Sequence, residues 1–387
     1  MSDRTFDIIL YGATGFTGAL VAEHLLDTYG TARDLTWAIA GRNEEKLQQV
    51  KQTIGASRDL VTIHADASDP ETIDAMAAKA KVIISTVGPY QLYGDALVAA
   101  CAKAGTDYVD LTGEPNWIAK MIPLHEVEAK KSGARIVFSC GFDSVPFDCG
   151  VLFTQEEAKK KFGAYAPRVR GRVRSMTGAM SGGTAASGMA TQMAAMADPN
   201  VAKILANPFA LTPGFEGPEQ PDGNKRYEDT VAGGWVAPFM MASINTKAVH
   251  RSNFLLGHRW GKDFLYDEMR MTPPPRTDGV RPAPMAMPAM PKPGEGPSKA
   301  ERDAGSYDVV FIAEYADGRT FRCAVKGDKD PGYGSTSKML GESAVCLVRD
   351  VPRTRTPGGC WTASAAMGDA LIKRLTANAG LQFVVEG

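Results

Sequence analysis

The 387-residue chain has few cysteines and histidines, and neither residue type recurs at a metal-binding spacing. The six cysteines, Cys101, Cys140, Cys149, Cys323, Cys346 and Cys360, include no Cys-x-x-Cys pair. The five histidines are equally scattered. We therefore expect neither a disulfide framework nor a metal site, and the scattered thiols indicate reduced cysteines in the cytoplasm.

The chain also lacks a strong net charge, −1 at pH 7, and has no basic run. Without a basic patch, a nucleic-acid partner is not expected. Residues 175–197 carry no charge, but Gly, Ser, Thr and Gln are too frequent there for a membrane span, so we predict a buried or pocket-lining segment. The first strand begins almost at the N-terminus, and we expect no signal peptide.

A glycine-rich turn near the N-terminus is the most informative stretch that is present. Residues 8–11 are a continuous apolar run, Gly12, Gly15 and Gly18 follow at three-residue spacing, and residues 19–26 are typical of a helix. Glycines at this spacing also occur in ordinary tight turns, but strand, glycine turn and helix in this order predict a site for the pyrophosphate of a dinucleotide. The coenzyme contacts expected in the turn are Gly12, Thr14, Gly15, Phe16 and Thr17.

The end of the second predicted strand, residues 35–40, indicates which coenzyme binds. An NAD site would place an acidic residue here to bind the ribose 2′-hydroxyl. This chain has Arg42 instead, with Lys46 one turn into the next helix. Because a guanidinium pairs well with a 2′-phosphate, we predict NADP(H) rather than NAD(H). The alternative is a solvated arginine that begins a helix.

Two further strands carry expected coenzyme contacts at their ends. Asp66 follows the strand at residues 60–66, where it would either contact the adenine or cap the helix that begins near Pro70. The fourth strand, residues 82–87, runs into a Gly-Pro turn. Ligands of parallel sheets lie beyond the carboxyl ends of the strands, so the residues of this exit should line the nicotinamide side. The contacts expected there are Thr86, Val87 and Gly88.

With strands at residues 106–111 and 135–139, six strands alternate with helices. This order predicts an α/β fold with a doubly wound parallel sheet. Candidates for a proton-donating or polarising group lie at the exits of its last three strands: Tyr90, Glu114, Asp143 and Ser144. Two of them have a structural alternative, because Tyr90 would also suit a packing role at a turn and Asp143 a helix cap.

Five motifs together resemble one family. They are Gly12-Ala13-Thr14-Gly15-Phe16-Thr17-Gly18, Ala40-Gly41-Arg42-Asn43, Thr86-Val87-Gly88-Pro89-Tyr90, Tyr108-Val109-Asp110-Leu111-Thr112-Gly113-Glu114 and Gly141-Phe142-Asp143-Ser144-Val145-Pro146. Over about the first 150 residues the sequence resembles the saccharopine-dehydrogenase-like oxidoreductases. It is most similar to the branch that includes the trans-acting enoyl reductases of mycobacterial lipid assembly. Residues 182–184 and 238–253 match more loosely.

The resemblance implies an organisation into three parts. Residues 1–147 would form a Rossmann domain that binds NADP(H), and residues 148–334 an α+β substrate domain that contains a predicted hairpin at Asp317-Gly318. Residues 335–387 would form helices that pack back on the first domain. The resemblance also implies hydride transfer as the activity.

The central region leaves several interpretations open. Met189, Met193 and Met196 form a helical stripe that would either line a hydrocarbon site or pack in the core. Arginines alternate along residues 168–174, where an anionic carrier would dock or where the sheet simply has a charged face. Residues 271–299 are rich in Pro and Met, as expected of a loop or lid, a membrane-touching flap or a linker.

The function that we predict is NADPH-dependent hydride transfer to the enoyl C=C bond of a lipid or polyketide-like acyl substrate. The alternatives are an imine or carbonyl reductase of a smaller metabolite and a non-catalytic NADP(H)-binding sensor or scaffold. Amino-acid substrates are disfavoured because the central region is rich in Met, Ala, Gly and Pro. A carrier-bound substrate, a homodimer and a peripheral membrane contact of the cytoplasmic protein stay open.

Overall fold

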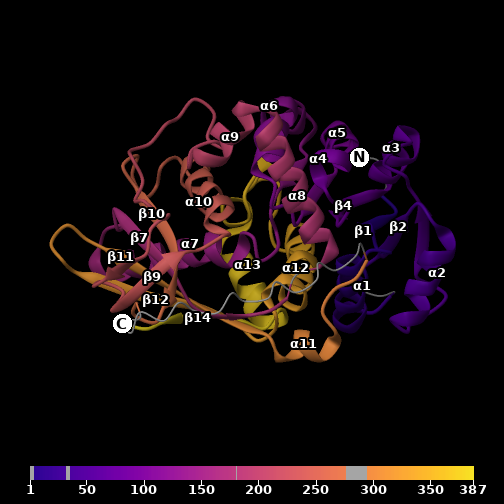
Figure 1. The fold of residues 1–387 in the computed structure, drawn as a ribbon. Coiled ribbons are helices and arrows are strands. Elements are labelled where there is room, and N and C mark those ends of the chain that lie inside the picture. Colours follow the sequence, from indigo (N-terminus) through magenta and orange to yellow (C-terminus); the bar gives the residue numbers. More distant parts are fainter. Residues whose placement is uncertain (1–3, 32–34, 180, 276–293) are drawn as a thin grey trace.

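The computed structural model describes residues 4–31, 35–179, 181–275 and 294–387. Its first sheet has the strand order β13-β6-β5-β4-β1-β2-β3, and each neighbouring pair is parallel. Strands β4, β1 and β2 of this sheet are labelled in Figure 1. The strands are β1 (Phe6–Tyr11), β2 (Trp37–Gly41), β3 (Val61–His64), β4 (Ala80–Ser85), β5 (Asp107–Asp110), β6 (Arg135–Val137) and β13 (Gly359–Trp361). The helices between them are α1 (Phe16–Tyr29), α2 (Glu44–Thr53), α3 (Pro70–Lys79), α4 (Tyr90–Tyr93), α5 (Asp95–Ala104) and α6 (Pro115–Ser132).

This arrangement confirms the predicted doubly wound parallel sheet, with one correction. The sheet has seven strands rather than six, because β13 of the C-terminal segment pairs with β6. Only three residues of β13 take part, which is too short for an apolar pattern to show in the sequence. The central strand β1 has Ile8, Ile9 and Leu10 fully buried, as expected of a strand that is covered on both faces.

A second sheet is mixed and has the order β14-β12-β11-β7-β10-β9-β8. Its strands are β7 (Arg168–Thr177), β8 (Tyr227–Asp229), β9 (Gly234–Pro238), β10 (Leu265–Thr272), β11 (Ser306–Glu314), β12 (Thr320–Gly327) and β14 (Leu381–Val385). The predicted hairpin at Asp317-Gly318 is confirmed as the turn between β11 and β12. The remaining helical elements are α7 (Val145–Phe162), α8 (Gly182–Ala197), α9 (Pro199–Ala206), α10 (Ala242–Leu255), α11 (Lys299–Ala304), the π-helical turn η1 (Pro331–Ser335), α12 (Thr336–Arg349) and α13 (Ala363–Asn378).

The C-terminal segment joins the two sheets. Helix α12 packs on α1, β4 and β5, while α13 packs on α12 and α7, so the two helices lie between the sheets (Figure 1). The predicted return of the C-terminal helices to the first domain is therefore confirmed. The last two strands belong to different sheets: β13 extends the first sheet, and β14 extends the second. The exact domain boundaries stay a prediction.

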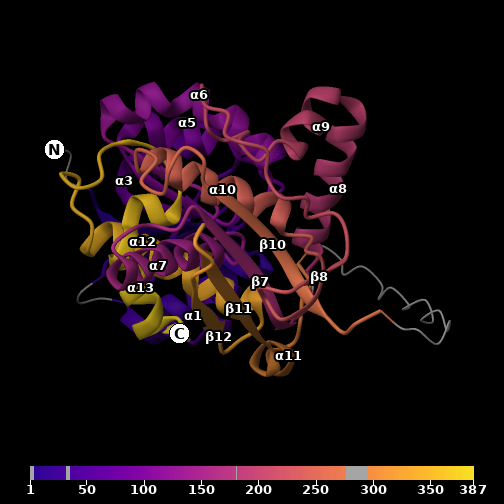
Figure 2. The same ribbon diagram turned by 90° about the vertical axis from the view of Figure 1, so that its left-hand side faces the viewer.

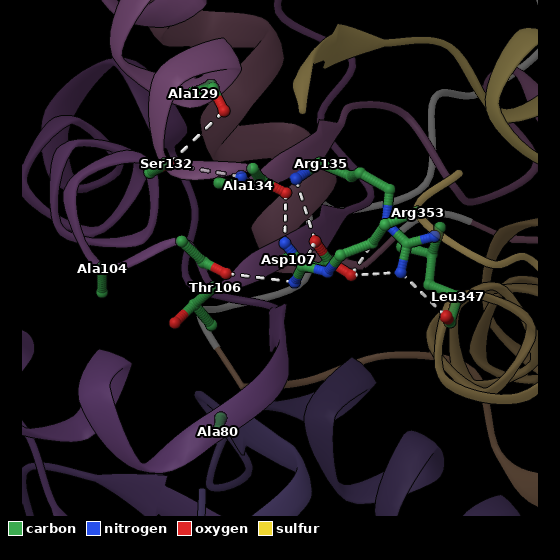
Figure 3. A network of polar contacts seen from close by, with 12 residues as sticks. Ala80, Ala104, Thr106, Asp107, Ala129, Ser132, Ala134, Arg135, Leu347 and Arg353 are labelled. Carbon is green, nitrogen blue, oxygen red and sulfur yellow. Dashed lines mark hydrogen bonds and ion pairs between the residues drawn. The ribbon is translucent and has the colours of Figure 1, made fainter. Parts of the chain in front are cut away.

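A buried ion pair fastens this segment to the first sheet (Figure 3). Arg135 of β6 is 3% exposed and its Nε donates to Asp107 Oδ2 on β5 at 2.9 Å. Its other guanidinium nitrogens donate to the carbonyls of Val351 at 2.6 Å and Leu347 at 2.8 Å, both in the C-terminal segment. Arg353 donates to the same carboxylate at 3.1 Å. The buried pair of Asp107 and Arg135 thus joins two strands to the end of α12.

The predicted arginine face on β7 exists, but the arginines are not free. Arg172 is fully buried and forms ion pairs with Asp229 and Asp267. The other three also face carboxylates: Arg168 pairs with Asp267 and Glu314, Arg170 with Asp229 and Glu314, and Arg174 with Asp308 and Glu386. This favours the charged-sheet interpretation, because neutralised arginines present no free positive surface to an anionic carrier.

Most of α8 is exposed, so the prediction of a buried segment at residues 175–197 was wrong there, whereas the pocket-lining alternative stays a prediction. Only Gly182 and Ala185 of this helix are buried. Met189, Met193 and Met196 are 52%, 66% and 79% exposed, so the methionine stripe is not part of the core. The reason is the orientation of α8, which projects with α9 from the body of the molecule (Figure 2).

No helix within the described ranges combines the length and the hydropathy needed to cross a membrane. Most of the Pro- and Met-rich stretch at 271–299 lies outside the described residues, which resume at residue 294. Its first two residues belong to β10. The lid, flap and linker interpretations of this stretch therefore stay predictions.

Replacing Arg135 with Met should strongly destabilise the protein. The variant leaves the buried Asp107 carboxylate without its main partner, which typically costs about 3–5 kcal/mol. Urea unfolding followed by circular dichroism would measure the loss. The control is Lys131→Met, because the Lys131 side chain is 78% exposed and its removal should change the free energy of unfolding by less than about 0.5 kcal/mol. Equal stability of the two variants would contradict the assigned role of Arg135.

Candidate active site

The turn between β1 and α1 has no room for side chains at two of its glycines. A Cβ at Gly18 would lie 2.2 Å from the carbonyl oxygen of Gly12, so only glycine lets α1 approach the end of β1. Gly12 itself has φ +90°, and a Cβ there would be 2.7 Å from both Thr86 Oγ1 and Val87 Cγ2. The glycines thus bring the helix, the turn and the exit of β4 into direct contact.

The first turn of α1 is free to bind an anion. Its N-cap is Gly15, and no side chain caps the helix there. The backbone N–H groups that begin a helix need acceptors, and together with the positive end of the helix dipole they favour a phosphate. Gly12, Thr14, Gly15, Phe16 and Thr17 all belong to this turn or to the start of α1, so they fit the pyrophosphate of a dinucleotide.

Arg42 lies directly after β2 at the same edge of the sheet, and its side chain is exposed. It interacts electrostatically with Asp66, whose pKa is lowered mainly by hydrogen bonds from Ser68. The alternative in which Asp66 caps α3 was wrong, because Asp69 is the N-cap and accepts a hydrogen bond from the backbone N–H of Glu71. The geometry leaves Arg42 available for the 2′-phosphate, and Asp66 stands beside it.

The exit of β4 contacts the glycine turn. Thr86 donates from its backbone N–H to the Tyr11 carbonyl at 3.0 Å and from its hydroxyl to the Gly12 carbonyl at 3.0 Å. Val87 packs against Gly12, as described above, and Gly88 follows at the entry to α4. Thr86, Val87 and Gly88 therefore continue the coenzyme edge toward the middle of the sheet, where the nicotinamide is expected.

Tyr90 and Glu114, the two candidates near α4, already use their polar atoms in hydrogen bonds within the protein. The Tyr90 hydroxyl donates to the Ser85 carbonyl at 2.9 Å, the residue is 4% exposed, and burial holds its pKa well above the usual range. Glu114 is 1% exposed and accepts hydrogen bonds from the backbone N–H groups of Tyr90 and Gln91, both at 2.9 Å. These contacts favour structural roles for both side chains.

Asp143 and Ser144 differ, because their side chains have unused hydrogen-bonding capacity. They lie between β6 and α7, and neither Asp143 Oδ1 nor Ser144 Oγ has a hydrogen-bond partner in the described part of the chain. The capping alternative for Asp143 was wrong, since the N-cap of α7 is Ser144 and no side chain caps that helix. Burial raises the pKa of Asp143 to about 7, so a large fraction of this carboxyl is protonated near neutral pH.

A second carboxyl, which is buried and was not predicted from the sequence, faces this site from the other sheet. Glu268 of β10 is 1% exposed, and it accepts hydrogen bonds from Tyr266 Oη at 2.8 Å and from Asn245 Nδ2 at 2.9 Å. Burial raises the pKa of Glu268 to about 8, and Asp143 adds to the effect. Nothing in the local sequence marks Glu268, because tertiary packing alone brings β10 and α10 to the end of β6.

The family of this chain follows from its similarity to known proteins. Residues 8–137 match the saccharopine dehydrogenase NADP-binding domain. A trans-acting enoyl reductase of Mycobacterium tuberculosis H37Rv is 37% identical over 97% of this chain and 96% of that protein. A provisionally named trans-acting enoyl reductase of the same strain is 40% identical with the same coverage, and that of Mycobacterium ulcerans is 36% identical.

The chain belongs to the trans-acting enoyl reductase family. Its predicted resemblance is therefore confirmed over nearly the whole length rather than over the first 150 residues alone. The matching nucleotide domain also confirms NADP(H) as the coenzyme and an oxidoreductase as the class of enzyme. Among solved structures, saccharopine dehydrogenase (L-Glu forming) from Saccharomyces cerevisiae aligns with a TM-score of 0.54 at 15% identity. That alignment covers 98% of this chain and 100% of the yeast chain, and it confirms the fold.

Replacing Arg42 with Glu should weaken NADPH binding to this family member by about ten- to hundredfold, because hydrogen bonds to a charged group contribute roughly 1.5–3 kcal/mol. NADH has no 2′-phosphate, and its affinity should change little. Fluorescence titration would give both dissociation constants. Arg58→Glu is the matched control. Arg58 is exposed and precedes β3, so it lies at the amino ends of the strands, whereas Arg42 lies at their carboxyl ends. An unchanged NADPH affinity in Arg42→Glu would rule out the 2′-phosphate assignment.

Proposed function

We propose that this protein is an NADPH-dependent enoyl reductase that reduces the C=C bond of an α,β-unsaturated acyl thioester. The observation that carries the proposal is the half-buried Asp143 carboxyl, which follows β6 at the edge of the sheet where we expect the nicotinamide; its Oδ1 has no hydrogen-bond partner among the described residues, and its pKa is raised to about 7. Such reductions need a hydride at the β-carbon and a proton at the α-carbon. The relatives are named enoyl reductases, which supports the reduction of a C=C bond.

Bound NADPH supplies the hydride in this reaction. Asp143 then gives its proton to the α-carbon as the double bond is lost, and a neutral carboxyl is suited to this step because its pKa lies close to the working pH. The unpartnered Ser144 hydroxyl is the group that we assign to the thioester carbonyl, where a hydrogen bond stabilises the negative charge that develops. Tyr90 was the other candidate, but its donor is already used by Ser85.

The charges of the second sheet support an acyl substrate over an amino acid. A substrate with several carboxylates needs cationic partners, and the arginines of β7 are already paired with acidic side chains. We extend the proposal to an acyl chain of the lipid or polyketide type that is delivered on a separate carrier, because the relatives are named trans-acting. A homodimer and a peripheral membrane contact stay predictions.

Replacing Asp143 with Asn should lower kcat by at least about 100-fold, because a positioned general acid typically contributes 10²–10⁴-fold. NADPH affinity should be retained, since the side chain lies outside the phosphate turn. In the wild type, kcat/KM should be full below pH 7 and fall as the pH rises through about 7, where Asp143 loses its proton. Stopped-flow NADPH oxidation across pH values measures both effects.

The matched control is Asp74→Asn, which alters an Asp side chain on α3 that is 51% exposed. This variant should keep the wild-type rate and pH profile. An Asp143→Asn protein with a normal rate, or with an unchanged fall above pH 7, would contradict the assignment of the proton donor.

The reaction itself is tested by comparing substrates. Turnover with an enoyl N-acetylcysteamine thioester is the expected result. Turnover only with a keto acid and an amine would favour the imine reductase instead, and tight NADPH binding without any turnover would favour a sensor or scaffold.

A further inference from the structure

A small cluster of side chains encloses the first residue of α1, next to the coenzyme turn. The ring of Phe16 lies edge-on to Tyr333 of η1, with centroids 5.3 Å apart. The Arg302 guanidinium is 5.6 Å from the centroid of the same ring. A Cβ at Gly296 would be only 2.4 Å from Phe16 Cε1, so the segment before α11 also presses on this ring. A residue of the phosphate turn is thus held by parts of the chain beyond the first domain.

The hydroxyl of Tyr333 continues this contact to helix α8. It lies 2.7 Å from Thr184 Oγ1 and accepts a hydrogen bond from the backbone N–H of Ser181. Ser181 is the N-cap of α8, and Thr184 lies in its first turn. Tyr333 is 2% exposed, so this hydroxyl has little access to water as a substitute partner. The N-terminal end of α8 is therefore fixed to the aromatic pair at the coenzyme turn.

The inner face of α8 borders the nicotinamide end of the site. A Cβ at Gly88 would lie 3.5 Å from Ser187 Oγ, and Gln91 Nε2 donates to Thr191 Oγ1 at 3.2 Å. Elsewhere the helix has few anchors, since Gly182 and Ala185 are its only buried residues. A helix with so little buried surface opens at low cost, so a few hydrogen bonds decide how much of the time it is closed.

We propose that Tyr333 is a positioning residue whose ring contacts the coenzyme turn through Phe16 and whose hydroxyl holds α8 over the nicotinamide end. With the coenzyme bound, the backbone of the turn would be ordered, and with it the Phe16 ring against Tyr333. Tyr333 would in turn hold α8 closed beside Gly88. The substrate half of this inference rests on the proposed function, whereas the coenzyme half requires only NADPH binding.

The variant Tyr333→Phe tests the hydroxyl, because it keeps the ring that contacts Phe16. NADPH affinity should stay within about twofold of the wild type. The KM for the enoyl N-acetylcysteamine thioester should rise about tenfold, which corresponds to about 1.4 kcal/mol and to one hydrogen bond. Tyr93→Phe is the matched control, since Tyr93 of α4 is 48% exposed and its hydroxyl should not affect KM.

Hydrogen exchange separates positioning from a purely structural role. NADPH alone should slow amide exchange across residues 182–197 in the wild type and in Tyr93→Phe, but not in Tyr333→Phe. Two variants of Thr184 test the hydrogen-bond partner of the Tyr333 hydroxyl. Thr184→Val should behave like Tyr333→Phe, whereas Thr184→Ser should show the wild-type response because it keeps the hydroxyl oxygen.

Three outcomes would overturn the inference: unchanged exchange of residues 182–197 on adding NADPH to the wild type, a normal KM in Tyr333→Phe, or a loss of NADPH affinity in Tyr333→Phe as large as the rise in KM. If NADPH protects α8 through Tyr333 but no enoyl thioester is reduced, the proposed function fails while the coupling of Tyr333 to the coenzyme turn is supported.

Discussion

The whole site depends on the close contact between Gly18 and the carbonyl of Gly12, where any side chain would collide with the backbone. This contact sets α1 against the end of β1, so that the uncapped first turn of the helix lies where we expect the coenzyme phosphates. It also puts the glycine turn against Thr86 and Val87, where we expect the nicotinamide side to begin. In this proposal the same few atoms position both the coenzyme and the substrate.

Burial raises the pKa values of two carboxyls at the site, Asp143 and Glu268. Asp143 lies where the first sheet meets α7 and has no hydrogen-bond partner for Oδ1 in the described residues, so loss of its proton is unfavourable. Glu268 approaches from the second sheet and is also held neutral by burial. Two carboxyls with raised pKa values at the junction of the sheets suit a reaction that consumes a proton with each hydride. The paired arginines of β7 leave little positive charge for an acidic substrate.

Local patterns predicted the parallel sheet of the first half of the fold and the NADP(H) coenzyme, because the strand–glycine–helix order is a short-range feature. The individual coenzyme contacts, Arg42 among them, stay predictions. The features that failed depend on distant packing. Strand β13 is too short to recognise, and the exposure of Met193 follows from how α8 is oriented. Glu268 reaches the site through the packing of β10 and α10, and Tyr333 through the contact of η1 with α1. Asp143 was predicted as a candidate, but its lack of a hydrogen-bond partner is a property of the folded protein.

The most direct test of the central claim follows the hydride itself. The protein is incubated with NADPH that carries deuterium at C4 and an enoyl thioester in ordinary water, and the product is examined by NMR. The account predicts one deuterium at the β-carbon, from one face of the nicotinamide only, and hydrogen from solvent at the α-carbon. A product without deuterium at the β-carbon, or deuterium that appears only at a carbinol or amine carbon, would contradict it.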